Sequence, residues 1–246
     1  MKIILIVCLG AATASIGAGL WGLSAATAAT VSISALKDNT IYSESGSVSN
    51  GAGDNIFAGK TVAGNERRAL FFFPVSANLP SCVKVTAVTL TLHMSRTASG
   101  PKTVTLHKVL TDWGEGTSDA TAQEGAGAAA TTGDATWTFT FYNTSSWGSA
   151  GGDFVATASA SQSVDAIGSY AWSGQQMIAD VQAWADGPTT NFGWILIGDE
   201  TVSGTAKRFD SRTNPTEADR PVLQIDYIDC TPTEPDTWGN IKSLYR

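Results

Sequence analysis

Residues 83–94 read VKVTAVTLTLHM, and this stretch decides the fold class. From Val88 onward, apolar side chains alternate with polar ones, which is the period-two pattern of a strand with one buried face. Val83 and Val85 alternate in the opposite phase, so the pattern shifts near Ala87. This shift predicts a β-bulge, or a strand that passes from one packed layer to another.

Similar short segments recur along the chain, with turn residues between them. Residues 136–141 alternate aromatics with threonines, which predicts a strand with an aromatic inner face and a solvated threonine face. Residues 70–73 and 192–197 are apolar at consecutive positions, a pattern typical of central strands covered on both sides. Leu223 and Ile225 mark the inward face of the last strand. Together these segments predict an all-β fold, a jelly-roll-like β-sandwich.

One short helix is predicted among the strands and is expected to pack at an open end of the sandwich. Ser173 can cap its start, and Gly187 followed by Pro188 stops it. Its apolar face consists of Met177, Ile178, Val181, Trp184 and Ala185.

Two stretches, 117–135 and 144–168, are rich in Ala, Gly, Ser and Thr and contain few large side chains. They are predicted to be long surface loops.

The N-terminal residues 1–29 have the features of a cleaved signal peptide. Lys2 precedes an apolar run, and Ala26-Thr27-Ala28 offers a small-residue cleavage site. An uncleaved membrane anchor is the alternative, because the apolar run is nearly long enough to span a bilayer. Cleavage predicts a secreted, extracellular protein without a membrane attachment.

After the signal, residues 30–230 are predicted to form the sandwich domain, and residues 231–246 a linker and a short tail. The linker reads TPTEP, which favours an extended conformation. The apolar face around Trp238 is expected to lie off the sandwich, and folding back over a sandwich edge is the alternative.

The predicted exported chain contains two cysteines, Cys82 and Cys230, because Cys8 lies within the signal. An even number of cysteines in an oxidising compartment predicts one disulfide, with two buried thiols as the alternative. Loss of Lys2 with the signal takes the formal net charge from −7 to −8. No cluster of Lys and Arg offsets this charge, so nucleic acid is not an expected partner.

Five segments follow one another in an order found in a known family: DNTIY at 38–42, RRALFFF at 67–73, DWGE at 112–115, DVQAW at 180–184 and RFDSR at 208–212. In this order they resemble the DNRLRE-domain proteins, which are secreted bacterial and archaeal β-sandwich modules. Some members are classed as carbohydrate-binding modules, including alginate binders attached to lyases. The resemblance therefore implies a non-catalytic module whose partner is a polysaccharide or another extracellular surface component.

The chain departs from the family pattern in two places. Ala/Gly-rich sequence follows DWGE, and Thr213 stands where an acid often follows the second arginine. For this reason the resemblance implies no particular ligand. A purely structural or adhesive extracellular protein with no sugar ligand is the alternative function.

No catalytic residues are predicted, and the protein is not expected to be an enzyme. A polysaccharide-degrading enzyme is the less favoured alternative, since glycosidases need only two carboxylates. Such carboxylates are expected to be loop acids or ion-pair partners of nearby arginines; they are Glu115, Asp199, Glu200 and Asp210.

No cofactor and no zinc site are expected, because His93 and His107 have no evident partner ligands. Oxygens of the 50–55 loop are candidate calcium ligands, although the spacing is not that of an EF-hand.

Sugar recognition combines aromatic rings with planar hydrogen-bonding groups. The aromatics and polar side chains least committed to the core are the predicted ligand-binding residues, namely Trp113, Glu115, Tyr142, Trp147 and Arg212.

Overall fold

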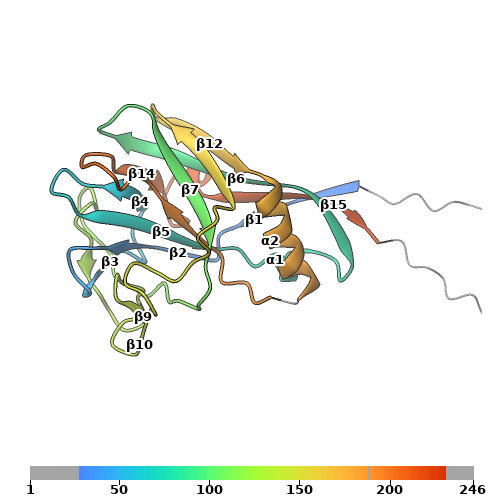
Figure 1. The fold of residues 1–246 in the computed structure, drawn as a ribbon, viewed down its shortest axis with the longest axis horizontal. Coiled ribbons are helices and arrows are strands. Elements are labelled where there is room, and N and C mark those ends of the chain that lie inside the picture. Colours follow the sequence, from blue (N-terminus) through green and yellow to red (C-terminus); the bar gives the residue numbers. More distant parts are fainter. Residues whose placement is uncertain (1–27, 188, 231–246) are drawn as a thin grey trace, which may run out of the picture.

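A computed structural model describes residues 28–187 and 189–230, and it shows two packed β-layers in which every strand pairing is antiparallel (Figure 1). The first layer contains β1 (Ala28–Ser34), β15 (Val222–Asp229), β6 (Val83–Thr97), β12 (Gly168–Ser173), β14 (Lys207–Asp210) and β4 (Asn55–Lys60). The second contains β3 (Val48–Ser49), β2 (Lys37–Tyr42), β5 (Glu66–Phe72), β13 (Trp194–Ile197), β7 (Lys102–Lys108) and β11 (Ala160–Val164). The predicted all-β sandwich is confirmed.

The remaining elements are short, apart from one helix. Strand β8 (Ala128–Ala129) pairs with β3, and β9 (Phe139–Phe141) forms a separate hairpin with β10 (Ser145–Ser146). The helices are α1 (Val75–Asn78), α2 (Gln175–Asp186) and the 3-10 turn η1 (Glu217–Asp219). No helix in the described residues is long and apolar enough to cross a membrane.

Strand β6 contains the predicted β-bulge. Along its pairing with β15, Asp226 lies opposite Ala87 but the next residue, Tyr227, lies opposite Val85, so Thr86 is the extra residue. The bulge explains how Val85 and Val88 are both buried although they differ in phase.

The strand that passes between layers is β4 rather than β6. Its first residues pair with β14, whereas Gly59 and Lys60 pair with β5. Gly59 has a φ of +112°, and a Cβ there would lie 2.9 Å from the carbonyl oxygen of Thr205. Only glycine therefore fits where the chain crosses from one layer to the other.

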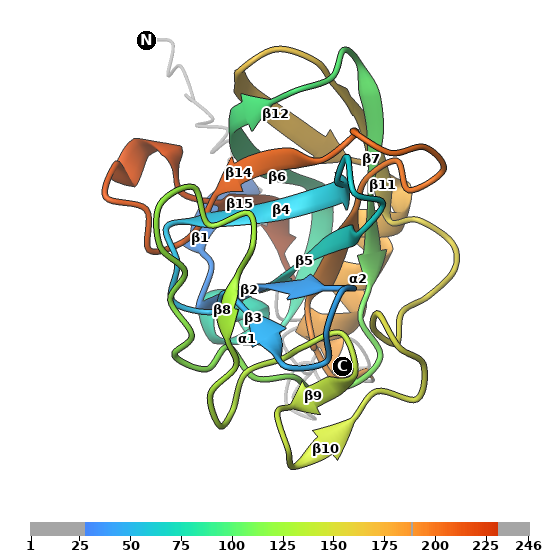
Figure 2. The same cartoon turned by 90° about the vertical axis from the view of Figure 1, so that its left-hand side faces the viewer.

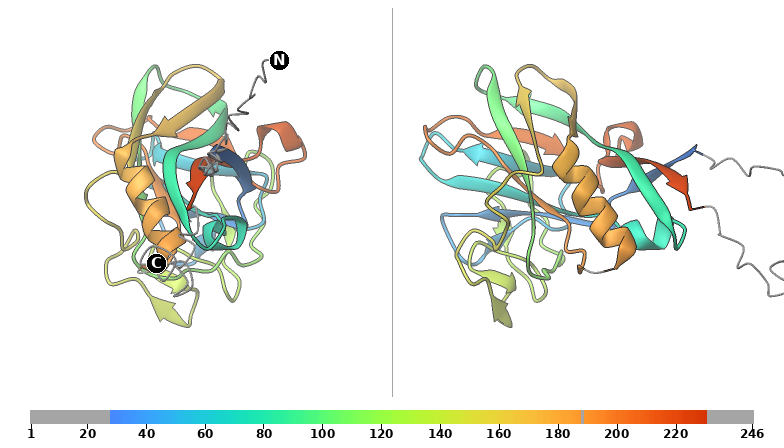
Figure 3. Two further views of the ribbon diagram at one scale, coloured as in Figure 1. Left: turned by 90° about the vertical axis from the view of Figure 1, so that its right-hand side faces the viewer. Right: turned by 45° about the vertical axis from the view of Figure 1, so that its right-hand side comes forward.

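Helix α2 packs against β6 and α1 and buries Met177, Val181 and Trp184 in the core shared by the two layers (Figures 1 and 3). It ends as predicted at Gly187, whose φ is +79°. Its start differs from the prediction, because Ser173 is the last residue of β12 and Gly174 occupies the capping position. Pro188 lies outside the described residues.

The second layer is covered on both faces, as its sequence predicts. One face contributes Phe71 and Trp194 to the core between the layers, and the other buries Leu70 and Ile195. The cover of this outer face comes from the segment between β7 and β11, whose β9–β10 hairpin lies below β2 and β3 in Figure 2. Its buried contributions are Val109, Trp113, Ala135 and Trp147.

This arrangement corrects two expectations about the same segment. The stretches rich in small residues are not merely surface loops, because they bury Ala135 and Trp147 and supply the edge strand β11. Residues 136–141 also differ from the prediction. Thr136 and Thr140 are buried, whereas the three aromatics between and after them are only partly buried. Only Phe139–Phe141 are a strand, in the hairpin with β10.

The predicted disulfide is present between Cys82 and Cys230, whose Cα atoms are 5.4 Å apart. It joins the start of β6 to the end of β15, where Val83 already pairs with Asp229. The predicted linker and tail lie outside the described residues. The predicted signal peptide lies outside them too, apart from Ala28 and Ala29, which begin β1.

Candidate functional site

Trp113 and Trp147, two of the predicted ligand-binding residues, are core residues. Trp113 has no exposed surface and Trp147 is 6% exposed. Each indole N–H donates to a backbone carbonyl, that of Phe192 for Trp113 and that of Thr136 for Trp147, both at 2.9 Å. Neither ring presents a face to a ligand.

Glu115 and Arg212, two more predicted ligand-binding residues, bind each other. The Arg212 guanidinium donates to both carboxylate oxygens of Glu115 at 2.5 Å. The Glu115 carboxylate also accepts the backbone N–H of Asp38, and the Asp38 carboxylate accepts the backbone N–H of Arg212 at 2.7 Å. These contacts tie β2 to the segments that follow β7 and β14.

The Asp38 carboxyl group in this cluster is unusual. It is 1% exposed, and its Oδ1 atom has no hydrogen-bond partner among the described residues. Burial, together with the nearby charge of Glu115, raises the pKa of Asp38 to about 7, although the Arg212 N–H acts in the opposite direction. The clamp formed by Asp38, Glu115 and Arg212 therefore contains one buried carboxyl group whose ionised form is destabilised.

Tyr142 lies apart from these residues, in the turn of the β9–β10 hairpin. Its ring is partly buried and meets that of Phe139 edge to face, with the ring centres 5.6 Å apart. Every Phe, Trp and Tyr side chain in residues 28–187 and 189–230 is buried or partly buried. The described residues therefore include no fully exposed aromatic ring on which a sugar would stack.

The four carboxylates considered for catalysis each have a basic partner. Asp199 pairs with Lys102 at 2.9 Å and Glu200 with Arg68 at 2.7 Å, while Glu115 is held by Arg212. Asp210 contacts the imidazole of His93 at 2.6 Å. Asp210 therefore has no arginine partner in the described structure, although Arg208 stands two residues from it in sequence, and Arg208 has no carboxylate partner there.

The 50–55 loop, considered for calcium, is organised by the buried carboxylate of Glu124. One oxygen accepts the side-chain amide of Asn50 and the backbone N–H of Asn55, and the other accepts the N–H of Asp54. Calcium binding there remains a prediction.

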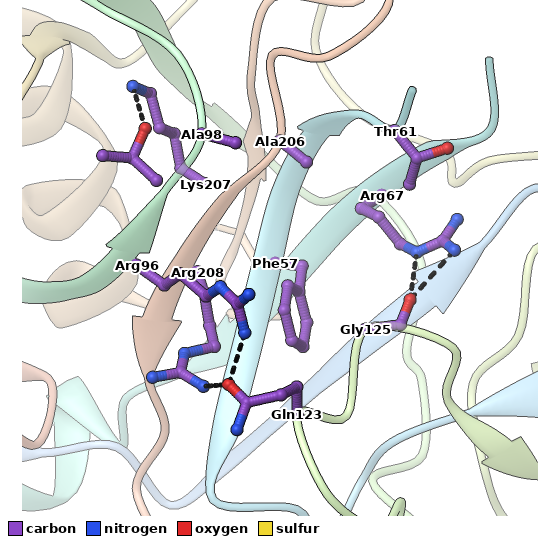
Figure 4. A pocket seen from close by; sticks show the side chains of 11 residues that line it. Phe57, Thr61, Arg67, Arg96, Ala98, Gln123, Gly125, Ala206, Lys207 and Arg208 are labelled. Carbon is purple, nitrogen blue, oxygen red and sulfur yellow. Dashed lines mark hydrogen bonds between the residues drawn. The ribbon is translucent and has the colours of Figure 1, made fainter. Parts of the chain in front are cut away.

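A pocket of about 180 Å³ opens where β14, β4 and β6 meet the loop that follows Ala120 (Figure 4). Arg96 of β6 and Arg208 of β14 lie directly opposite each other in the strand register. Both guanidinium groups donate to the side-chain oxygen of Gln123, at 2.5 Å and 2.9 Å, as Figure 4 shows. The ring of Phe57, which is 7% exposed, contributes an apolar wall.

The two arginines differ from the other arginines of the described residues. Arg67, Arg68, Arg212 and Arg220 each contact a glutamate. Arg96 and Arg208 contact none, although acidic residues outnumber basic ones by 22 to 15 in this chain. Like charges directly opposite each other in a sheet are destabilising. The pair therefore carries positive charge that the fold leaves uncompensated.

The loop that carries Gln123 has a strained backbone. Ala122 and Glu124, its two neighbours, both have a φ of +60°, a region that residues other than glycine rarely adopt. The Glu124 carboxylate anchors the loop through the contacts described above, and Gly125 accepts hydrogen bonds from the buried guanidinium of Arg67. These contacts hold Gln123 over the two arginines against the strain, and backbone strain of this kind gathers at ligand sites.

Lys207 also lines this pocket, but its ammonium group is satisfied within the fold. It donates to the hydroxyl of Thr97 and to the carbonyls of Ser99 and Gly100, at 2.6 to 2.9 Å. Burial lowers the pKa of Lys207. Arg96 and Arg208 therefore supply the charge available to a ligand.

None of the five predicted ligand-binding residues lines this pocket. Neither models of known protein families nor curated proteins match the chain.

Proposed function

We propose that the protein is a secreted, non-catalytic binding module, and that the pocket of Arg96 and Arg208 binds a carboxylate group of an acidic polysaccharide or surface component. The observation that carries this proposal is the pair of opposed arginines, which have no carboxylate partner among the described residues. A guanidinium group is a planar fork whose geometry matches a carboxylate. The amide oxygen of Gln123 accepts from both forks and so occupies the place of a carboxylate oxygen.

The volume of the pocket suits one sugar unit of a longer polymer. Pockets that enclose drug-sized ligands measure roughly 300–1,000 Å³, whereas this one measures about 180 Å³. A single sugar ring would place its carboxylate on the arginines and its C–H face against Phe57. The rest of a polymer would lie outside the pocket.

The resemblance to DNRLRE-domain proteins supports a binding role. Asp38, Glu115 and Arg212 come from three separate segments that carry the resemblance, and they meet in one clamp. Contacts between these three segments are expected if the chain shares the fold of that family. In this proposal the clamp stabilises the sandwich, and the arginine pocket selects a ligand that bears a carboxylate.

The proposal is tested by titrating the purified protein with a uronate polymer, polygalacturonate, and with a neutral glucan. Binding to the uronate polymer alone is expected, with an affinity that falls as salt is added. Arg96→Gln and Arg208→Gln should each weaken binding at least about tenfold, the equivalent of one lost charge-assisted hydrogen bond. The matched control is Lys84→Gln, which removes one positive charge from an exposed position on the same strand.

The stability of the same variants separates lost binding from lost folding. Removing one of two opposed like charges should leave the free energy of unfolding unchanged or raise it by about 0.2–1 kcal/mol. If the arginine variants melt normally and bind as tightly as the parent protein, the pocket is not the ligand site. If no acidic or neutral polymer binds the parent protein, the structural or adhesive role is favoured instead.

Gln123→Glu provides an independent prediction about the same pocket. The new carboxylate would lie within hydrogen-bond distance of both guanidinium groups, so it should raise the melting temperature by a few degrees at most, since the residue is exposed. It should also compete with an acidic ligand and lower its affinity at least about tenfold. Gln162→Glu, on β11, adds the same charge elsewhere and should leave binding unchanged. Unchanged binding by the Gln123 variant would contradict the proposed ligand position.

A further inference from the structure

A second group of side chains converges on the outer face of the first layer, next to the arginine pocket. His93 alternates with the buried Leu92 and Met94 on β6, so its side chain points away from the core. Asp210 ends β14, two residues after Arg208, and Asp219 lies in η1 shortly before β15. Pairing of β15 with β6, which places Val222 opposite Thr91, brings the η1 turn back beside His93.

The three side chains offer nitrogen and oxygen atoms that all lie within 4.8 Å of one another. The Nδ1 atom of His93 is 2.6 Å from a carboxylate oxygen of Asp210 and 3.8 Å from one of Asp219. Two ligands on a tetrahedral Zn²⁺ ion lie about 3.3 Å apart, given metal–ligand bonds of about 2.0–2.1 Å. These two distances lie on either side of this value, so small side-chain shifts would bring His93 and each carboxylate to the spacing of two ligands on one ion.

The charges and the exposure of the group also favour a cation. Among the described residues, neither Asp210 nor Asp219 has a lysine or arginine within ion-pair distance, and their one basic neighbour is His93. The Asp210 side chain is 5% exposed and forms the floor of the group, whereas those of His93 and Asp219 are 22% and 32% exposed. An ion would therefore enter from solvent and would keep water on its open side.

We propose that His93, Asp210 and Asp219 bind a divalent transition-metal ion, with Zn²⁺ the best fit to the set. An imidazole suits Zn²⁺, and two carboxylates complete a three-ligand set with an open position for water. The imidazole nitrogen among these three ligands argues against Ca²⁺, which takes oxygen ligands almost entirely. This site is separate from the arginine pocket, so either proposal can fail without the other.

The test uses full-length protein without a polyhistidine tag, treated with EDTA, dialysed and titrated with ZnCl₂ at pH 7.5. Binding of one ion per chain and a higher melting temperature are expected, because a ligand that binds only the folded state stabilises it. Asp219→Asn should weaken Zn²⁺ binding at least about tenfold. The Asp219 side chain has no ion-pair or hydrogen-bond partner other than His93 in the described structure, so the fold should tolerate the change. Glu217→Gln removes a neighbouring acid of η1 and is the matched control.

The imidazole resonances give a direct readout, because the chain contains only two histidines. Zn²⁺ should shift the ring nitrogen signals of His93. It should leave those of His107 in place, since both nitrogens of that ring already contact Val155 and Thr105. His93→Gln assigns the signals and should abolish binding. The proposal is overturned if Zn²⁺ does not bind, if Asp219→Asn binds it as tightly as the parent protein, or if the His93 signals do not move.

Discussion

Replacing Cys82 and Cys230 together with serine is expected to lower the free energy of unfolding by about 5 kcal/mol, the largest effect of any change considered for this protein. The disulfide joins residues that are 148 positions apart, and a link over so long a loop removes much of the conformational entropy of the unfolded chain. The folded state loses few contacts. Val83 still pairs with Asp229, and the backbone N–H of residue 230 still donates to the carbonyl of residue 82. The effect therefore acts mainly through the unfolded state.

Urea denaturation followed by fluorescence measures this effect, with the parent protein examined both oxidised and reduced. The reduced parent and the double-serine variant should unfold at the same, much lower urea concentration. Ser81→Ala is the matched control, because this exposed side chain stands next to Cys82 and takes no part in the disulfide. A loss smaller than about 1 kcal/mol in the double variant would show that the unfolded chain is already constrained by other contacts.

The layers and the main strand of the sandwich were predictable from local sequence. The phase shift near Ala87 indicated the bulge, and the observed extra residue, Thr86, is its neighbour. This prediction succeeded because burial of one sheet face imposes a period of two, and any extra residue reverses the phase. The strands around Leu70 and Ile195 were recognised for a different reason, since burial of both sheet faces makes consecutive positions apolar.

Local sequence did not identify which residues cover the outer face of the second layer. Trp113 and Trp147 stand in or beside Gly- and Ala-rich sequence, where no periodicity distinguishes a core residue from an exposed one. A signal was nevertheless present. Strands that are apolar on both faces require a second layer of apolar side chains, and these tryptophans were among the few large residues left to supply it.

The arginine pocket and the His93 group depend on pairings between distant strands. Arg96 and Arg208 become neighbours only through the register of β6 with β14, and Asp219 reaches His93 only because β15 returns along β6. Neither register can be read from one strand alone. Arg208 in particular stands two residues from Asp210 in sequence, which made an ion-pair network the natural expectation. In the fold, His93 contacts Asp210 and Arg208 contacts Gln123.

Replacing Asp38 with asparagine is expected to remove a pH dependence of stability from the protein. The pKa of Asp38 is about 7 in the folded protein and 3.8 in its ordinary state, so the folded chain holds this proton more tightly than the unfolded chain does. Stability therefore falls as the pH rises from about 4 to about 7, and above that range the loss is complete. A pKa difference of about three units corresponds to a loss on the order of 4 kcal/mol.

The measurement compares the free energies of unfolding of the parent protein and Asp38→Asn across this pH range. The difference between the two isolates Asp38 from every other titrating group, and the variant should gain relative to the parent as the pH rises from 4 to 7. Asparagine keeps an oxygen that can accept the Arg212 N–H at the position of the present 2.7 Å contact. Asp112→Asn is the matched control, because this carboxylate is 59% exposed and pairs with Lys37 in the same part of the fold. Equal slopes for the parent protein and Asp38→Asn would mean that the buried carboxyl group is already ionised at pH 4, and that Arg212 compensates its charge far better than the geometry of the clamp indicates.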